Sequence, residues 1–216
     1  MEELKKLKYS IILPALFIFL LWIIKAVEYA NQVDYYRYGV FPRTINGLFG
    51  IVLSPLIHSD INHLLSNSIP IFILCTGLIY FYRNIAYRVI VFVWILSGIL
   101  VWIAARDCYH VGASGLIYGI ASFLFFSGVI RKDIRLASVS LLVVFLYGGL
   151  VWGVFPIFPH ISWEYHLFGA ISGFMAAFIY RKKGPKTIEW SWDEDEAVSE
   201  EPDGGDLFDD FQNKTL

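Results

Sequence analysis

The sequence predicts an all-α membrane protein built as a bundle of six transmembrane helices. Hydrophobic residues make up 57% of the 216 residues and aromatic residues 18%, and the mean hydropathy is +0.59. These values lie well above the apolar share of a soluble domain. The apolar residues gather in six segments of roughly the ~20 residues that a helix needs to cross a bilayer. Basic residues cluster on one side of these segments, as expected of a multi-pass protein.

The six expected spans cover residues 9–24, 62–82, 89–105, 112–130, 136–155 and 164–180. Lys5, Lys6 and Lys8 precede the first segment, which could therefore be a secretory signal peptide. No small-residue cleavage pattern follows it, and further apolar segments do, so we expect a retained first span.

Lysine and arginine residues predict the orientation of the spans. With the N-terminus in the cytoplasm, and apart from Lys214 in the tail, twelve basic residues lie inside and four lie outside. The inner set is Lys5, Lys6, Lys8, Arg83, Arg88, Arg131, Lys132, Arg135, Arg181, Lys182, Lys183 and Lys186, and the outer set is Lys25, Arg37, Arg43 and Arg106. This asymmetry follows the positive-inside rule. We therefore expect a multi-pass protein of the cell (inner) membrane with both termini in the cytoplasm.

Two further regions differ in character from the spans. The first outer connection, about Glu28 to Asp60, is rich in tyrosine and phenylalanine and is broken by glycine and proline. Such a segment is expected to lie in the membrane interface. Residues 189–216 carry eleven acidic residues and one lysine. We therefore expect a membrane domain over residues 1–183 and an acidic, disordered cytoplasmic tail over residues 184–216.

Three stretches place polar residues near the outer ends of expected spans, where such residues are costly and commonly functional. The first is Val111–Gly119, in which Ser114 stands between Gly112 and Gly115 at the first turn of the fourth span. A helix start offers unpaired N–H groups that can hold developing negative charge. The alternative is a small-residue face used only for helix packing.

The second stretch, His58–Asn67, enters the second span from outside. His63 and Asn67 are four residues apart and share one helix face, where both can donate hydrogen bonds. A metal site is the alternative, because histidine is a common ligand. His58 and His63 are five apart and no glutamate follows His58, so the zinc-protease pattern is not met. Cys75 and Cys108 form no zinc motif either. We expect no metal and no cofactor.

The third stretch, Glu164–Gly173, enters the sixth span from outside and places His166 at a depth similar to that of Ser114. Gly169 and Gly173 form a small face one turn further in. This face is expected to pack closely on Gly115 and Gly119 of the fourth span. Such packing would bring the imidazole toward the serine hydroxyl.

Together these side chains form a candidate catalytic constellation. We expect Ser114 to be the nucleophile and His166 to be its general base. Asn67, His63 and the backbone N–H at Ser114 are expected to stabilise the oxyanion. No acidic residue stands where it would orient His166, so Tyr118, one turn after Ser114, is expected to position the ring by stacking.

The three stretches resemble the rhomboid family of intramembrane serine proteases, and the likeness spans about residues 9–181. The motifs that carry it are HSDINHLLSN (58–67), GASGLIYG (112–119) and HLFGAISG (166–173). Residues 40–43, with Gly47, Leu48 and Pro55, are also similar to the first loop of bacterial members.

The resemblance implies that Ser114 is the nucleophile, that His166 is the base, and that His63 and Asn67 contact the oxyanion. It also implies a six-helix bundle with a water-filled cavity open to the outside, and substrates that are single transmembrane helices cut near their outer ends. Two features depart from the family pattern. No tryptophan stands between Glu28 and Asp60, where members often have a Trp-Arg pair, and Tyr165 stands where a small residue is common.

The expected function is therefore a serine endopeptidase that cleaves transmembrane segments, with membrane-protein substrates and lipid as partners and no nucleic acid. One alternative is an inactive relative that binds membrane helices, but both Ser114 and His166 are present. Another is a small transporter, in which polar residues would line a solute path. Transporters often contain internal repeats, and none is evident between residues 9–82 and 89–181. The oligomeric state is left open.

Overall fold

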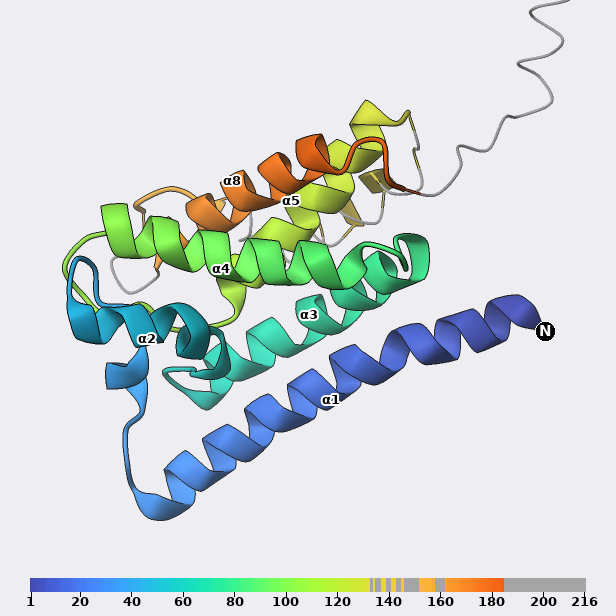
Figure 1. Cartoon of the computed structure of the whole chain (residues 1–216). Helices are drawn as coiled ribbons and strands as arrows, with labels where there is room; N and C mark the ends of the chain where they lie inside the picture. Colours follow the sequence, from blue (N-terminus) through green and yellow to red (C-terminus); the bar gives the residue numbers. More distant parts are fainter. Residues whose placement is uncertain are drawn as a thin grey trace, which may run out of the picture. The chain divides into compact units, whose positions relative to one another are not determined.

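Helices make up the regular structure of this protein (Figure 1). The structure is a computed structural model that describes residues 1–132, 134, 137–138, 141–142, 145, 152–157 and 162–184. Its helical elements are α1 (Glu2–Asn31), η1 (Tyr36–Tyr38), α2 (Ile45–Leu53), η2 (Ser54–Leu56), α3 (Ile61–Phe81), α4 (Ala86–Ala104), α5 (Ser114–Ile130) and α8 (Trp163–Ile179). Within these residues strand pairing is limited to one isolated bridge, between Val40 and His110.

Five of the six expected spans coincide with α1, α3, α4, α5 and α8. Most of the expected span 136–155 lies outside the described residues, as does nearly all of the tail expected at 184–216. Helices α1, α3 and α4 are long and apolar enough to cross a bilayer, and α5 is apolar but shorter. The predicted fold class, an all-α membrane bundle, is confirmed.

Helix α1 is longer than the apolar run that predicted it. Its first turn contains Glu2 and Glu3, whose charges favour a helix N-terminus. It ends where Gln32 takes a left-handed conformation and its N–H bonds to the carbonyl oxygens of Glu28 and Tyr29. The apolar run marked only the part of the helix that suits lipid, so the polar turns at both ends were missed.

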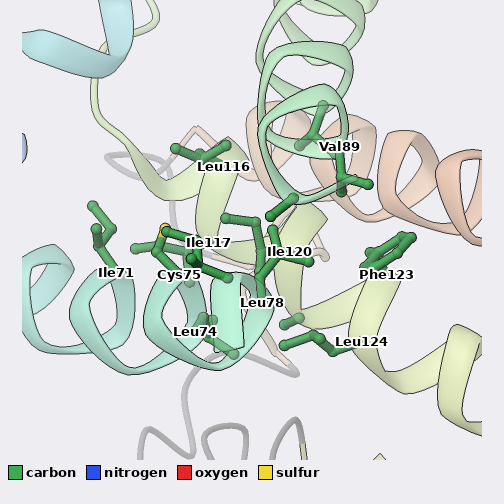
Figure 2. Packing of buried hydrophobic residues seen from close by; sticks show 14 of the residues in the cluster. Ile71, Leu74, Cys75, Leu78, Val89, Leu116, Ile117, Ile120, Phe123 and Leu124 are labelled. Carbon is green, nitrogen blue, oxygen red and sulfur yellow. The ribbon is translucent and has the colours of Figure 1, made fainter. Parts of the chain in front are cut away.

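The main core lies where α3, α4 and α5 meet (Figure 2). Helix α3 contributes Leu74 and Leu78, and α5 contributes Ile120 and Phe123, all of them almost fully buried. Figure 1 shows α1 running along α3, the helix on which it mainly packs. Much of the surface of α1 is left apolar and exposed, as expected of a helix that faces lipid.

Helices α5 and α8 share the most extensive contact between two helices in the described part of the chain. The reason is the pair of glycine stripes that the sequence indicated. A Cβ atom on Gly169 would overlap the backbone of Gly115, and one on Gly173 would overlap the backbone of Gly119. Small residues on both helices therefore let the two backbones touch. The predicted packing of α8 on α5 is confirmed.

The first outer connection is tied to the end of α4 by Arg43. Its guanidinium donates to the carbonyl oxygens of Ala105 and Ile103, at 2.8 and 3.2 Å, and it pairs with Asp107. Trp102 of α4 donates its indole N–H to the carbonyl oxygen of Thr44 at 2.8 Å. This connection lacks a tryptophan of its own, and α4 supplies the indole that packs against it.

Candidate active site

Ser114 is the first residue of α5 and 7% of its surface is exposed. The chain reaches it through Gly112, whose φ of +108° favours glycine. The Gly112 N–H donates to the carbonyl oxygen of Ser54 at 2.9 Å, and the Ala113 N–H lies 3.5 Å from His58 Nε2. The nucleophile predicted from sequence therefore lies at the start of a helix. Two hydrogen bonds hold the two residues that precede it.

His166 lies on α8 and is held on two sides. Its Nδ1 lies 2.9 Å from the carbonyl oxygen of Gly153, a geometry in which Nδ1–H donates and Nε2 is the acceptor. Its ring stacks on Tyr118 with centroids 4.2 Å apart and an angle of 10° between the planes. The predicted stacking by Tyr118 is confirmed. The Gly153 carbonyl was not predicted, because any residue can offer a backbone oxygen and no sequence signal marks it.

One cavity of about 840 Å³ collects the predicted polar side chains. It is lined by Ser114, Tyr118 and His166 on α5 and α8, and by His63 and Asn67 on α3. No hydrogen bond joins Ser114 Oγ to the His166 ring within the described residues. Catalytic hydrogen bonds are often long before substrate binds, so this separation is compatible with a catalytic pair.

His63 and Asn67 lie on the α3 side of this cavity. Asn67 Nδ2 donates to the His63 carbonyl oxygen at 2.7 Å, which occupies one of its two N–H groups. The His63 ring lies against Gly112, where a Cβ atom would overlap it. The start of α3 is capped by Asp60, which accepts the His63 N–H at 2.9 Å. That bond and a second one, donated by the Ser59 hydroxyl, lower the pKa of Asp60.

The remaining predicted site residues act as spacers. Gly112 leaves room for the His63 ring, while Gly115 and Gly169 let α5 and α8 meet. Because glycine has no side chain, these three residues can offer only backbone groups to the cavity.

His58 is 2% exposed and lies apart from the cavity lining. Burial, together with the charges of His63 and Lys25, lowers its pKa to about 3, so the ring is neutral at ordinary pH. It packs edge-on against His63 with centroids 5.1 Å apart. Among the described residues, no group of three or more histidine, cysteine, aspartate or glutamate side chains is arranged to hold a metal ion.

Sequence reasoning missed three contacts that hold the start of α8. Tyr165 OH and Ser54 Oγ form a hydrogen bond, and His110 Nδ1 lies 2.6 Å from Ser162 Oγ. Arg106 Nε lies 2.9 Å from an oxygen of the buried Glu164, an ion pair rather than an aligned hydrogen bond. Tyr165 departs from the family pattern, but the sequence does not show that the buried Ser54 is its partner.

The fold and the cavity define a class: a helical membrane protein that presents a serine and a histidine from two closely packed helices to one polar cavity. The family model for the rhomboid domain matches residues 46–183. This chain belongs to the rhomboid family.

Its similarity to individual proteins agrees with this assignment. It is 32% identical to an uncharacterized protein of Mycobacterium tuberculosis (strain ATCC 25618 / H37Rv) over 178 residues, which covers 76% of this chain and 72% of that one. It is 30% identical over 163 residues to YdcA of Bacillus subtilis (strain 168), whose name proposes a rhomboid protease, with 73% and 78% of the two chains covered. A mimivirus protein whose name proposes a rhomboid protein is 27% identical over 152 residues, covering 65% and 80%.

Proposed function

We propose that this protein is an intramembrane serine endopeptidase that cleaves transmembrane segments of other membrane proteins. The observation that carries the proposal is that Ser114, at a helix start, and His166, oriented by Gly153 and Tyr118, line the same cavity. Family membership gives the same chemistry independent support.

In the proposed acylation step, Ser114 Oγ attacks the carbonyl carbon of the scissile peptide bond while His166 Nε2 takes the hydroxyl proton. The oxyanion is stabilised by the N–H of Ser114, by the second N–H of Asn67 and by His63. Collapse of this intermediate breaks the C–N bond, and protonated His166 gives its proton to the leaving amine. An ester of Ser114 with the N-terminal fragment remains.

Water then completes the cycle. His166 takes a proton from a water molecule that attacks the ester carbonyl, and the same proton returns to Ser114 Oγ as the second product leaves. The polar side of α3, with His63, Ser66 and Asn67 along the cavity, offers a route for this water. A substrate helix must unwind locally, because its peptide bonds are otherwise hydrogen-bonded within the helix.

The proposed location is the cell (inner) membrane, with both termini in the cytoplasm, and it rests on the distribution of basic residues. In this orientation the starts of α3, α5 and α8, and the cavity between them, face outward. The resemblance to the family implies single-span substrates, and this orientation puts the proposed cut near their outer ends.

A serine-reactive fluorescent phosphonate tests the proposal directly. Purified wild-type protein should be labelled and should cleave a transmembrane substrate in liposomes, whereas Ser114→Ala should do neither. Ser172→Ala is the matched control, because Ser172 is a fully buried serine on α8 whose hydroxyl donates to the Phe168 carbonyl oxygen within its own helix. Equal labelling of wild type and Ser114→Ala would refute the assignment. A wild-type protein that binds substrate helices without labelling would favour the inactive relative.

A further inference from the structure

Ser54 and Tyr165 form a buried pair of hydroxyl groups beside the proposed catalytic residues. Their oxygen atoms lie 2.5 Å apart, and the two residues are 0% and 1% exposed. Ser54 is the first residue of η2, at the end of the first outer connection, and Tyr165 directly precedes His166 on α8. The pair therefore joins the outer connection to the helix that carries the base.

Ser54 also holds the segment that carries the nucleophile. Its carbonyl oxygen accepts the Gly112 N–H at 2.9 Å, two residues before Ser114. The Ser54 side chain is thus bonded to Tyr165, the neighbour of the base. The Ser54 backbone is bonded to Gly112, which leads into the nucleophile. Among the described residues, hydrogen bonds from Ser54 reach both sides of the proposed catalytic pair.

The Tyr165 ring makes a second link between the same two helices. A Cβ atom on Gly115 would overlap Cδ1 and Cε1 of this ring, so the ring lies directly on the residue after Ser114. Tyr165 is therefore covalently next to the base and in contact with the neighbour of the nucleophile. Because protein interiors are close-packed, a ring in this place fixes how closely the start of α8 approaches the start of α5.

We propose that Ser54 and Tyr165 are positioning residues that set the distance and orientation between Ser114 and His166. The proposal rests on the proposed function and extends it to residues that do not line the cavity. The tyrosine hydroxyl holds the ring in one place, and the ring holds the base helix at the required distance from the nucleophile. Geometry of this kind has a large effect on rate, because small misplacements of reacting groups lower it steeply.

Ser54→Ala, Tyr165→Phe and the double variant test this inference. Each single variant leaves one buried hydroxyl without a bond, so we expect its melting temperature to fall. Because the Tyr165 ring is then free to shift, we also expect kcat for a transmembrane substrate to fall by about tenfold. KM should stay within about twofold, because neither residue lines the cavity. Phosphonate labelling of Ser114 should slow in the same proportion as kcat. The double variant leaves no unpaired hydroxyl, so its melting temperature should return toward wild type while kcat stays low.

The chain offers a matched control in Tyr82 and Ser127, a second tyrosine–serine pair with oxygen atoms 2.6 Å apart. Ser127 lies near the far end of α5, away from Ser114. Tyr82→Phe and Ser127→Ala should lower the melting temperature and leave kcat of the folded protein unchanged.

Two results would overturn the inference while the proposed function stands: kcat within twofold of wild type in all three Ser54 and Tyr165 variants, or an equal fall of kcat in the control pair. A wild-type protein that neither cleaves nor labels would overturn the proposed function and this inference with it.

Discussion

At the scale of single residues, the polar groups of the cavity are held by contacts with other parts of the chain. His166 is fixed by a backbone oxygen and an aromatic ring rather than by a carboxylate. The stacking partner could be predicted because Tyr118 lies one helical turn from Ser114. The Gly153 carbonyl and the Ser54–Tyr165 bond could not, because they depend on how segments distant in sequence come together.

Asn67 allows a direct test of oxyanion stabilisation. With one N–H bound to the His63 carbonyl oxygen, its second N–H is available to a substrate oxyanion. Loss of one such donor typically costs ~3 kcal/mol, so Asn67→Ala should lower kcat by about a hundredfold with little change in KM. Steady-state kinetics in liposomes measures both.

Ser68→Ala is the control for Asn67. Ser68 is the next residue on α3, bonds to the Leu64 carbonyl oxygen and does not line the cavity. Its substitution should leave kcat unchanged. If Asn67→Ala retained the wild-type kcat, Asn67 would be a structural residue only.

The buried His58 predicts how stability depends on pH. Its pKa is about 3 in the folded protein, against an ordinary value of 6.5. Between these two pH values the unfolded chain binds a proton at His58 and the folded chain does not. The free energy of unfolding therefore falls as pH drops below about 6.5, and at pH 5 the loss from this residue is about 2 kcal/mol.

Thermal unfolding of the detergent-solubilised protein between pH 7 and pH 5 measures this effect. Wild type should lose stability over this interval, and His58→Gln, which cannot take up the proton, should lose about 2 kcal/mol less. Parallel curves for the two proteins would show that His58 does not carry the dependence.

At the scale of helices, the spacing of small residues predicted more than the hydrophobic pattern did. The glycine stripes of α5 and α8 predicted which two helices touch and which residues meet. The apolar runs located α3, α4 and α5 closely, but they missed the polar turns of α1. They also did not predict α2 as a helix, because glycine and proline suggested only short pieces. Its start is instead fixed by Thr44, which accepts the Gly47 N–H.

Replacing Gly169 with valine tests whether this packing sets the geometry of the site. The added side chain would overlap the Gly115 backbone, so α8 has to move away from α5 and carry His166 with it. A shift of ~1 Å can cost a hundredfold in rate, and we expect at least that loss of kcat. Activity is measured on protein shown to be folded by size-exclusion chromatography.

Ile171→Phe adds the same number of side-chain carbon atoms on an exposed position of α8 and should be tolerated. Should Gly169→Val cleave as fast as wild type, another contact, such as the Tyr118 stack, would have to bring Ser114 and His166 together.

At the scale of the whole molecule, charge predicts a topology that the fold alone does not give. Basic residues favour the cytoplasmic side by twelve to four. In a background with Cys75 and Cys108 replaced by alanine, Ser199→Cys should be protected from a membrane-impermeant thiol reagent in intact cells. Val33→Cys, on an exposed position after α1, should be labelled. Labelling of the tail position from outside would reject the six-span arrangement.

The helices of this bundle differ greatly in length, and this has a consequence for the surrounding lipid. At 1.5 Å per residue, the 30 residues of α1 extend about 45 Å, whereas the 17 residues of α8 extend about 25 Å. The hydrocarbon layer is about 30 Å thick, so the polar turns of α1 extend beyond it, whereas α8 falls short of it. Phe174 and Phe178 expose apolar surface on the short helix. Hydrophobic mismatch at the short helix is relieved by thinning of the bilayer beside it. The acyl-chain length of the host membrane thereby becomes a variable to which this protein is sensitive.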